Sequence, residues 1–335
     1  MSAPRISLIT PSYQQAAYLE ECIASVHGQD QGVEHIVVDG GSTDGSKAII
    51  ERHSDQFAWW CSEKDKGQSD AINKGLVHAT GDVFTWVNSD DALLPLAAER
   101  VHRAFQAHPE LLVFGGQVMH RDEKGERLFD RLNSTEPLQL FADPVINQPA
   151  TFYRMDVVKE IGGVDPALCY VMDVELWWQM LFRHGTQHLR FERKALAMFR
   201  LHDESKTVTQ HSGFLLEMAS LLLALSERTG NEDVSQVLSL GYPERRTTRG
   251  IPAHGALHHA MVRAMAVHFL LKWHGHIHHE ADFRMMKALQ ERAIPDGGCP
   301  FLPGMEERWA KVRLAVAGTS WSRYRVRRKL KHIFG

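Results

Sequence analysis

Three loops of the sequence combine carboxylates with amides, hydroxyls and glycines, the groups that proteins use to handle phosphates, divalent cations and hydroxyl substrates. They are residues 39–46, 88–91 and 173–178, and a fourth polar run at residues 200–207 contains His202. Carboxylates crowded into a tight turn are costly to bury unless a cation or several amides satisfy them. The loops therefore predict a polar site, provided that the fold brings them together.

Residues 88–91 read Asn-Ser-Asp-Asp and place three oxygen-bearing side chains and a further carboxylate in one turn. Oxygen ligands favour Mg²⁺ or Mn²⁺ over zinc, whereas the alternative is a solvated turn. Asp173 and Glu175 are two residues apart in a predicted helix, so they do not share a face and only one is expected to enter a site. Helix N-terminal acids favoured by the macrodipole are the alternative there.

Residues 39–46 begin with Asp39 and continue with glycines and hydroxyls. An Asp/Ser/Gly turn with a helix cap is one interpretation. A calcium-binding EF-hand loop is excluded because Gly41 and Thr43 stand where its third and fifth ligands would be. Gly41 also excludes an aspartyl nucleophile followed by a second aspartate.

Residues 63–75 combine basic side chains with a predicted helix N-terminus, which suits an anion. The amides of Gln68 and Asn73 in this run could bind a nucleotide or hold the loop. His202, at the end of a predicted strand, could complete a metal or diphosphate site, although a histidine in that place is more often structural or exposed.

Short apolar runs alternate with segments of helical spacing through the first 116 residues. They predict strands at 6–10, 33–39, 57–62, 83–87 and 111–114, and helices at 18–27, 47–53, 69–79 and 95–108. Strands separated by helices are typical of an α/β fold with a mostly parallel sheet, flanked by helices, whose strand ends carry the ligand chemistry.

The pattern changes after residue 116. A hairpin is expected at 117–131, a polar loop at 143–151, a helix at 173–184, and strands at 187–191 and 195–201. From about Thr207 the chain reads as largely helical. We therefore expect a catalytic domain over 1–207 and a mainly α-helical region over 208–335.

The net charge of -3 hides an uneven distribution. Residues 300–335 carry a net +7, and the preceding 299 residues carry -10. Near-neutrality overall argues against a protein that binds nucleic acid. The four cysteines (Cys22, Cys61, Cys169 and Cys299) form no C-x-x-C pair, which favours a reducing, cytoplasmic setting. Neither a signal peptide nor a membrane-spanning run is visible.

Two features of the C-terminal third stand apart. Eight histidines lie between His254 and His279, in a spacing that matches no H-E-x-x-H zinc motif. The tail, 322–335, places Val326, Leu330, Ile333 and Phe334 on one helical side among Arg and Lys. It fits either an interfacial helix on an anionic membrane or a basic terminal helix packed on the acidic body or on a second subunit of a homo-oligomer.

The ordered set of motifs resembles the family 2 glycosyltransferases over about the first 207 residues. The matching runs are Thr10-Pro11-Ser12-Tyr13, 39–46, 65–75, Ala79-Thr80-Gly81-Asp82, 88–91, 173–177 and 199–207. No single run is decisive, but their order and spacing are specific. The resemblance implies a GT-A fold, a Rossmann-like sheet flanked by helices, with a nucleotide-sugar donor and an inverting transfer.

By position, the resemblance implies that Pro11 and Tyr13 pack on the nucleotide base and that Asp39 reads its base and ribose side. Asn88-Ser89-Asp90 matches the family's D-x-D element, with Asp90 as the metal-binding carboxylate. Asn88, which replaces the first acid, is a weaker ligand that would hydrogen-bond the sugar or ribose instead.

The catalytic base of the family matches Asp173, and its late strand-end contact to metal or diphosphate matches His202. The acidic residue that usually precedes the base is Met172 here, which leaves Asp173 as the one clear candidate. A carboxylate can accept the proton of an attacking hydroxyl, and a divalent cation, Mn²⁺ or Mg²⁺, can stabilise a departing diphosphate.

The expected function is thus a metal-dependent inverting glycosyltransferase, with a UDP-sugar as the favoured donor and a glycan or lipid-linked acceptor. Surface-polysaccharide or glycolipid assembly at the inner face of a membrane is the expected setting. One alternative, a sugar-nucleotide pyrophosphorylase, would want a Gly-rich basic loop where residues 11–15 read Pro-Ser-Tyr-Gln-Gln. The other is an inactive scaffold of the same fold, against which the joint presence of Asp39, Asp90, Asp173 and His202 argues.

Overall fold

The computed structural model describes residues 4–29, 32–203, 205–244, 248–294 and 301–334. The chain divides into two units. The first unit is Met1–Thr135 with Val145–Phe214, and the second is Glu136–Pro144 with Leu215–Gly335. The division falls after Phe214, whereas the change in periodicity suggested Thr207. Residues 136–144 belong to the second unit although the first unit surrounds them in sequence.

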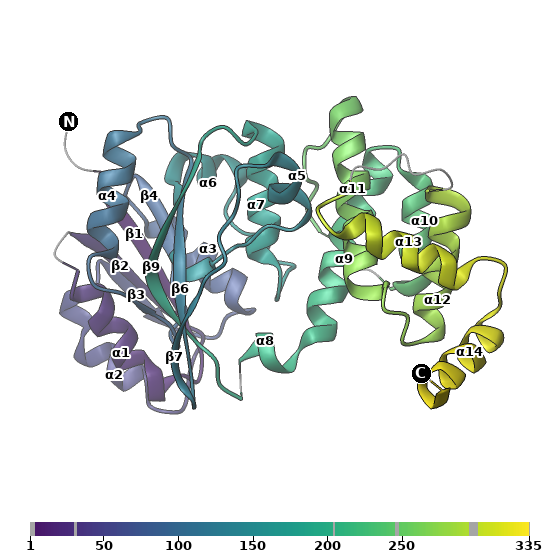
Figure 1. Ribbon diagram of the computed structural model, residues 1–335. Coiled ribbons are helices and arrows are strands. Elements are labelled where there is room, and N and C mark those ends of the chain that lie inside the picture. Colours follow the sequence, from purple (N-terminus) through teal and green to yellow (C-terminus); the bar gives the residue numbers. More distant parts are fainter. Residues whose placement is uncertain (1–3, 30–31, 204, 245–247, 295–300, 335) are drawn as a thin grey trace. The chain divides into compact units, whose positions relative to one another are not determined.

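The first unit is built on one sheet, whose central strands are buried on both faces (Figure 1). The strand order is β3-β2-β1-β4-β8-β6-β9-β5, and β7 pairs with β6. The strands are β1 (Ile6–Ser12), β2 (Val33–Asp39), β3 (Trp59–Ser62), β4 (Val83–Trp86), β5 (Ala92–Leu93), β6 (Val113–Asp122), β7 (Gly125–Phe129), β8 (Thr151–Arg154) and β9 (Leu189–Arg200).

The α/β class is confirmed, but the sheet is mixed. Strands β1 to β4 pair in parallel, as do β6 and β9, whereas β8 runs antiparallel to both β4 and β6. The sequence did not predict β8, which follows the expected loop at 143–151. The two strands expected at 187–191 and 195–201 are one strand, β9. It pairs with β6 on both sides of its charged middle, residues 192–194, which falls at a register shift near Gly115 and Gln117.

Helices cover both faces of the sheet (Figure 1). On one face, α1 (Ala16–His27) and α4 (Ala97–Ala107) pack on a core that includes Leu8, Val83 and Phe114, with α2 (Ser46–Arg52) beside α1. On the other face lie α3 (Gln68–His78), α6 (Met155–Ile161) and α7 (Met172–His184). Gly75 lets α3 approach β1 closely, since a Cβ there would stand 2.8 Å from Ile9 Cγ2.

The sheet gathers the polar loops at one edge. Ser12 and Asp39, the last residues of β1 and β2, are register partners, so the loops after these parallel strands start side by side. Residues 88–91 follow β4 and lead directly into β5, where Ala92 pairs with Met198 of β9. The polar run after β9 therefore lies beside residues 88–91.

The second unit is helical. It contains α5 (Pro137–Ala142), most of α9 (His211–Arg228), α10 (Glu232–Gly241), α11 (Gly255–His274), α12 (Glu280–Ala288), a π-helical turn (Leu289–Ala293), α13 (Met305–Val316) and α14 (Trp321–Phe334). Contacts join α11 to α5, α10, α12 and α13, around a core of leucine, methionine and phenylalanine side chains. No helix in the described ranges is apolar over a length that would span a bilayer.

The histidine cluster of this unit is built into its packing. His274 lies between Tyr242 and Asp282, at 2.8 Å from the hydroxyl and 2.7 Å from the carboxylate. His279 and Asp282 form a capping box at the start of α12. Across the described residues, no three His, Cys, Asp or Glu side chains gather in a way that could hold a metal ion. The structure therefore gives no support for a metal site here.

Candidate active site

A cavity of about 760 Å³ opens at the carboxyl ends of β1, β2, β4 and β9 in the first unit. Its wall contains six of the side chains predicted from the sequence: Pro11, Tyr13, Gln68, Asn88, Asp90 and Asp173. His202 bonds to a wall residue without lining the cavity, and Asp39 and Asn73 lie outside the wall. The fold thus brings together loops that are as far apart in sequence as Pro11 and Asp173.

The carboxylate of Asp90 is one candidate metal ligand. His202 Nε2 lies 3.0 Å from Asp90 Oδ2, and the two side chains remain 13% and 20% exposed. The ring of Tyr18 supports the imidazole at 4.9 Å between centroids. Arg200 Nε donates to the Asp90 carbonyl at 3.0 Å, which fixes the backbone of the turn. Asp90 therefore presents an accessible carboxylate with a histidine beside it.

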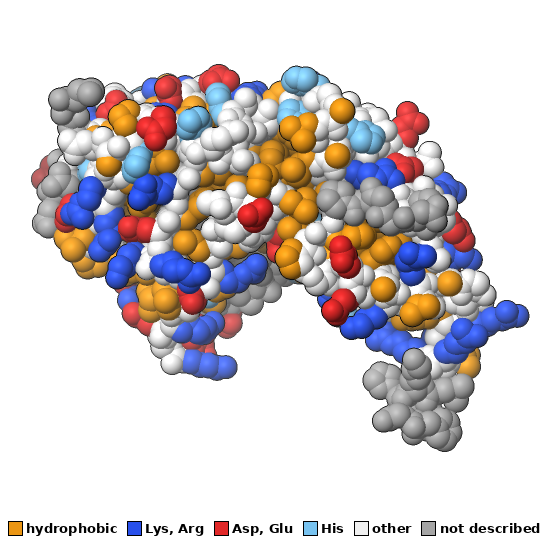
Figure 2. Space-filling model, turned by 45° about the horizontal axis from the view of Figure 1, so that its top comes forward, with side chains coloured by type: hydrophobic (Ala, Val, Ile, Leu, Met, Phe, Trp, Pro, Cys, Tyr) orange, Lys and Arg blue, Asp and Glu red, His pale blue; other side chains and the backbone are white. Residues whose placement is uncertain are grey.

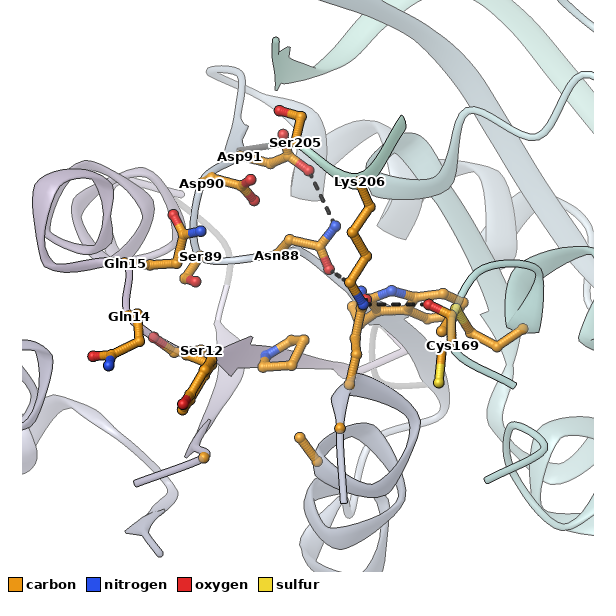
Figure 3. A pocket seen from close by; sticks show the side chains of 18 of the residues that line it. Ser12, Gln14, Gln15, Asn88, Ser89, Asp90, Asp91, Cys169, Ser205 and Lys206 are labelled. Carbon is orange, nitrogen blue, oxygen red and sulfur yellow. Dashed lines mark hydrogen bonds between the residues drawn. The ribbon is translucent and has the colours of Figure 1, made fainter. Parts of the chain in front are cut away.

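The neighbouring carboxylate, Asp91, is buried and serves the fold. Its Oδ1 accepts from the Arg200 backbone N–H at 2.9 Å, which ties β9 to the turn after β4. Burial, followed by the nearby charge of Asp90, raises the pKa of Asp91 well above its usual range. The Asn88 amide reaches Asp91 Oδ2 at 3.5 Å (Figure 3). A positive charge near Asp90 would relieve this crowding.

A chain of amides leads from Asn88 to a lysine. Gln68 Nε2 donates to Asn88 Oδ1 at 2.7 Å, and Lys206 Nζ donates to Gln68 Oε1 at 3.2 Å. Lys206 Nζ also donates to the Cys169 carbonyl at 3.2 Å, as Figure 3 shows. Sequence reasoning quoted Lys206 within a motif but gave it no role. Here it places a cation on the wall that also carries Asp90.

Asp173 is the second residue of α7 and half-buried. Its Oδ1 accepts the backbone N–H of Val174 at 2.9 Å. Burial raises the pKa of Asp173 to about 6. A carboxylate in this state is a stronger proton acceptor than an ordinary aspartate, yet it is still ionised at neutral pH. Met172, where the family usually has an acid, is buried.

Asp39 is fully buried, and its carboxylate accepts hydrogen bonds from residues of the following loop and from Ser62. Oδ2 accepts from Gly41 N–H at 3.2 Å, from Ser42 N–H at 3.0 Å and from Ser62 Oγ at 2.7 Å. The Ser42 hydroxyl donates to Oδ1. This carboxylate therefore shapes residues 40–42, and Gly40 and Gly41 are the members of that loop that line the cavity.

Asn73 is engaged in the same way. Its Nδ2 donates to the Val164 carbonyl at 2.8 Å, and the Val164 N–H donates to its Oδ1 at 3.0 Å. The amide thereby clamps α3 to the segment that leads towards α7. These two bonds fit the second of the roles predicted from the sequence, that of holding the loop, and a contact of Asn73 with a nucleotide stays a prediction.

Several buried polar atoms of the cavity wall have no hydrogen-bond partner in the described part of the chain. They are Ser12 Oγ, Gln15 Oε1 and Trp86 Nε1. Buried groups in this state are costly unless a ligand or water completes them. Gln148, on the same wall, donates to the Trp86 carbonyl at 2.6 Å. Neither Trp86 nor Gln148 was singled out from the sequence, because both lie in apolar or loop-like runs.

The donor set fits a divalent cation that is shared with a phosphate ligand. Asp90 and His202 supply one oxygen and one nitrogen, and no third His, Cys, Asp or Glu joins them among the described residues. Mg²⁺-type sites commonly take one or two protein ligands and complete their shell with phosphate oxygens and water. The described residues thus offer no closed protein cage, and their donor set fits a site that a diphosphate completes.

Comparison with known proteins gives a consistent family. Residues 7–178 match glycosyl transferase family 2. An uncharacterized glycosyltransferase of Mycobacterium tuberculosis is 34% identical over 174 residues, which are 49% of this chain and 64% of that protein. The amylovoran biosynthesis glycosyltransferase of Erwinia amylovora is 30% identical over 171 residues, again 49% and 64%. The matches span less than two thirds of these relatives' length.

Two solved structures share the fold. S. aureus TarS 1–349, in complex with UDP-GlcNAc, aligns with a TM-score of 0.58 and 15% identity over 86% of this chain and 80% of that one. A mannosyltransferase from Pyrobaculum calidifontis, in complex with GDP-Man and Mn²⁺, aligns with a TM-score of 0.52 and 16% identity over 97% and 83%. At these identities the likeness concerns the fold alone.

Proposed function

Because the chain belongs to glycosyl transferase family 2, we propose that it transfers a sugar from a nucleoside-diphosphate donor to a hydroxyl acceptor with inversion at the anomeric carbon. One observation carries this proposal. A single cavity is lined by Asp90, which His202 contacts from behind the wall and which suits a diphosphate-bound cation, and by a separate carboxylate, Asp173, whose pKa is raised to about 6.

The donor is proposed to lie along the strand ends. Its nucleoside packs near Pro11 and Tyr13 and against Gly40 and Gly41, whose loop Asp39 shapes. UDP-sugars are the first donors to test. When bound, Mn²⁺ or Mg²⁺ would be held by Asp90 and His202 and would stabilise the negative charge that builds on the leaving diphosphate.

Other wall residues are proposed to orient the diphosphate and the sugar. The Lys206 ammonium adds a positive charge on the same wall, at hydrogen-bond distance from Gln68. Asn88 and Gln68 offer amides that can exchange their mutual hydrogen bond for bonds to ribose or sugar hydroxyls. Each of these groups holds the donor, and none forms a covalent bond with it.

Asp173 is proposed to act as the general base. Its carboxylate accepts the proton of the acceptor hydroxyl while that oxygen bonds to the anomeric carbon. The bond from the anomeric carbon to the diphosphate oxygen breaks, and the nucleoside diphosphate keeps the electron pair. One displacement from the opposite side inverts the anomeric centre, so a covalent enzyme intermediate is not required.

The acceptor is proposed to be a glycan or a lipid-linked sugar, in surface polysaccharide or glycolipid assembly. Apolar wall residues, Met172, Phe199 and Phe214, lie in the same cavity as Asp173. They offer faces on which a sugar ring can pack. The acceptor would thus meet the base beside apolar faces of the cavity.

Thermal unfolding with nucleoside diphosphates, with and without Mn²⁺, tests the donor site. We expect UDP with Mn²⁺ to raise the Tm by several degrees, and either component alone to have a smaller effect. Asp90→Asn should remove the dependence on Mn²⁺, whereas Asp55→Asn, the same change at an exposed position, should keep it. If no nucleoside diphosphate stabilises the protein in a metal-dependent way, the donor assignment is wrong.

A second assay separates the reaction classes. Hydrolysis of nucleotide sugars, followed by release of nucleoside diphosphate, should reveal the preferred donor. A pyrophosphorylase would instead make nucleotide sugar and pyrophosphate from a sugar 1-phosphate and a nucleoside triphosphate, and an inactive scaffold would do neither.

A further inference from the structure

Helix α14 has an inner face that packs on the second unit. The rings of Trp321 and Tyr324 lie 5.9 and 5.5 Å from that of Phe283 on α12. Arg328 donates to the Ile277 carbonyl. At 3.6 residues per turn, Trp321, Tyr324 and Arg328 share one side of the helix. The rings of Trp321 and Tyr324 are therefore turned towards α12.

The outer face of α14 (Arg323, Arg325, Val326 and Arg327) is exposed. Val326 stands almost opposite the inner face and keeps 56% of its surface exposed. By helical position, Arg323 and Arg327 flank it on one side and Arg325 on the other. No ion pair involves these three arginines in the part of the chain that the structure describes. Helix α14 thus packs on α12, as a basic terminal helix lying on the rest of the chain would, while the cations of its outer face remain exposed.

Helix α13 adds further exposed groups of the same kinds. Lys311 and Arg313 are exposed, and Leu314 is 82% exposed. Figure 2 shows Lys and Arg side chains gathered at the lower right of the view, where the C-terminal part of the chain lies. The sequence continues the α14 pattern, since its helical spacing places Leu330, Ile333 and Phe334 on the side of Val326. Their side chains lie outside the described residues.

We propose that the outer face of α14 binds an anionic lipid surface, with Val326 entering the headgroup layer and the flanking arginines contacting lipid phosphates. An apolar stripe bordered by cations matches a phosphate layer that lies above hydrocarbon. The inner aromatic face fastens the helix to the second unit, so binding would anchor that unit rather than a loose tail. This inference does not depend on the proposed transfer reaction.

Charge favours lipid over the other partners. The first 299 residues carry -10, so an anionic surface would repel the rest of the chain and accept its basic end. A single-stranded nucleic acid would want exposed aromatic rings for stacking, but Trp321 and Tyr324 are packed against Phe283. A second copy of this chain would have to cover cations with an equal set of cations, since a symmetric contact pairs the same surface on both chains.

Vesicle flotation of the full chain tests the proposal. We expect binding to vesicles of 30% phosphatidylglycerol in phosphatidylcholine, loss of binding in pure phosphatidylcholine, and weakening by salt. Arg323→Glu with Arg327→Glu should weaken the partition coefficient at least tenfold, and Val326→Ser should weaken it a few-fold. Lys124→Glu with Lys194→Glu makes the same charge change at exposed positions of the first unit and should have little effect.

Folding and oligomeric state are checked in parallel by circular dichroism and light scattering. Equal binding to both vesicle types, or equal loss in the two double variants, would overturn the proposal. So would tighter binding to a single-stranded oligonucleotide than to the anionic vesicles, or a change of oligomeric state in Arg323→Glu with Arg327→Glu without any vesicle binding. Donor hydrolysis by the same variants should stay unchanged, which keeps a failure here separate from a failure of the transferase assignment.

Discussion

The loops on either side of the candidate active site use their carboxylates in opposite ways. After β2, Asp39 is fully buried and accepts four hydrogen bonds from its own loop and from Ser62. After β4 and at the start of α7, Asp90 and Asp173 line the cavity. Asp90 Oδ2 is bonded to His202, and Asp173 Oδ1 accepts the Val174 N–H. The Asp39 carboxylate shapes its own loop, whereas the carboxylates of Asp90 and Asp173 face the cavity, where a ligand could contact them.

Because of this difference, we expect some of these carboxylates to matter mainly for stability and others mainly for activity. A carboxylate satisfied by backbone and hydroxyl donors contributes to folding, and its loss leaves donors unpaired. A carboxylate kept partly unsatisfied in a cavity costs folding free energy and is retained for function. Changes on the β4–α7 side should therefore lower activity in a folded protein, whereas changes on the β2 side should lower stability first.

The largest expected effect is that of Asp173→Asn. Loss of the base should lower kcat about 10³-fold, because the asparagine amide cannot accept the acceptor's proton. Removing a desolvated charge should also raise the free energy of unfolding by about 1 kcal/mol at pH 8. Steady-state kinetics and urea unfolding measure the two effects. A variant that transfers sugar at the normal rate would place the base elsewhere.

Asp90→Asn should lower kcat/KM about 10²-fold at a fixed Mn²⁺ concentration, since the amide is a poorer cation ligand than the carboxylate. Higher Mn²⁺ should restore part of the activity, and the Tm of the free protein should change little. The matched change Asp55→Asn should alter neither. Loss of activity that Mn²⁺ does not rescue, together with unfolding, would move Asp90 to the structural side of the comparison.

Asp39→Asn should destabilise the protein by about 2 kcal/mol. Both carboxylate oxygens of Asp39 accept hydrogen bonds, so in either orientation the NH₂ group of the new amide would face another donor. The folded variant should keep kcat within a few-fold. Ser62→Ala, which removes one of the four donors, should cost less. Unchanged stability with a more than tenfold weaker affinity for UDP would instead assign Asp39 to nucleoside binding, as the family resemblance implies.

The smallest effect is the pH dependence. The pKa of Asp173 is raised to about 6 by burial, so kcat/KM should fall up to tenfold for each pH unit below that value as the base is protonated. The contribution of Asp173 to the free energy of unfolding changes with pH in the opposite direction to the activity. Because the folded-state pKa exceeds the ordinary value, this contribution favours folding at low pH and is lost as pH rises towards 6. A flat activity profile between pH 5 and 7 would contradict this role.

Much of the fold follows from the sequence because buried parallel strands leave a clear pattern. Short β-rich runs such as 6–10 and 33–39 are strands of the sheet, with ends within a few residues of those expected. Strand β8 and helix α6 were missed, because Thr151–Arg154 and Met155–Ile161 follow one another without a turn residue between them. Residues 136–144 belong to the second unit because α5 contacts α11, and local periodicity in the sequence carries no information about such a long-range contact.

The site divides along the same line. Residues 88–91 stood out because several polar groups in one turn directly after a buried strand are unusual in sequence, and Asp173 stood out because it matches the catalytic base of the family. The same pattern also picked out Asp39 and Asn73, whose side chains bond to loop backbone. A sequence shows that a polar side chain stands at a strand end or helix face, but not whether a ligand or a neighbouring N–H satisfies it. Lys206 and Gln148 depend on approach in space and carried no local pattern.

The position of α5 also bears on how the protein is made. Leu140 and Phe141 of this short helix are buried in the second unit, where α5 contacts α11. Helix α11 begins at Gly255, so on the ribosome, at about 5–20 residues per second, α5 waits roughly 6–23 s for the helix that covers it. Any fragment that stops near Phe214 would leave these two side chains uncovered permanently, and it should aggregate unless α5 is made polar.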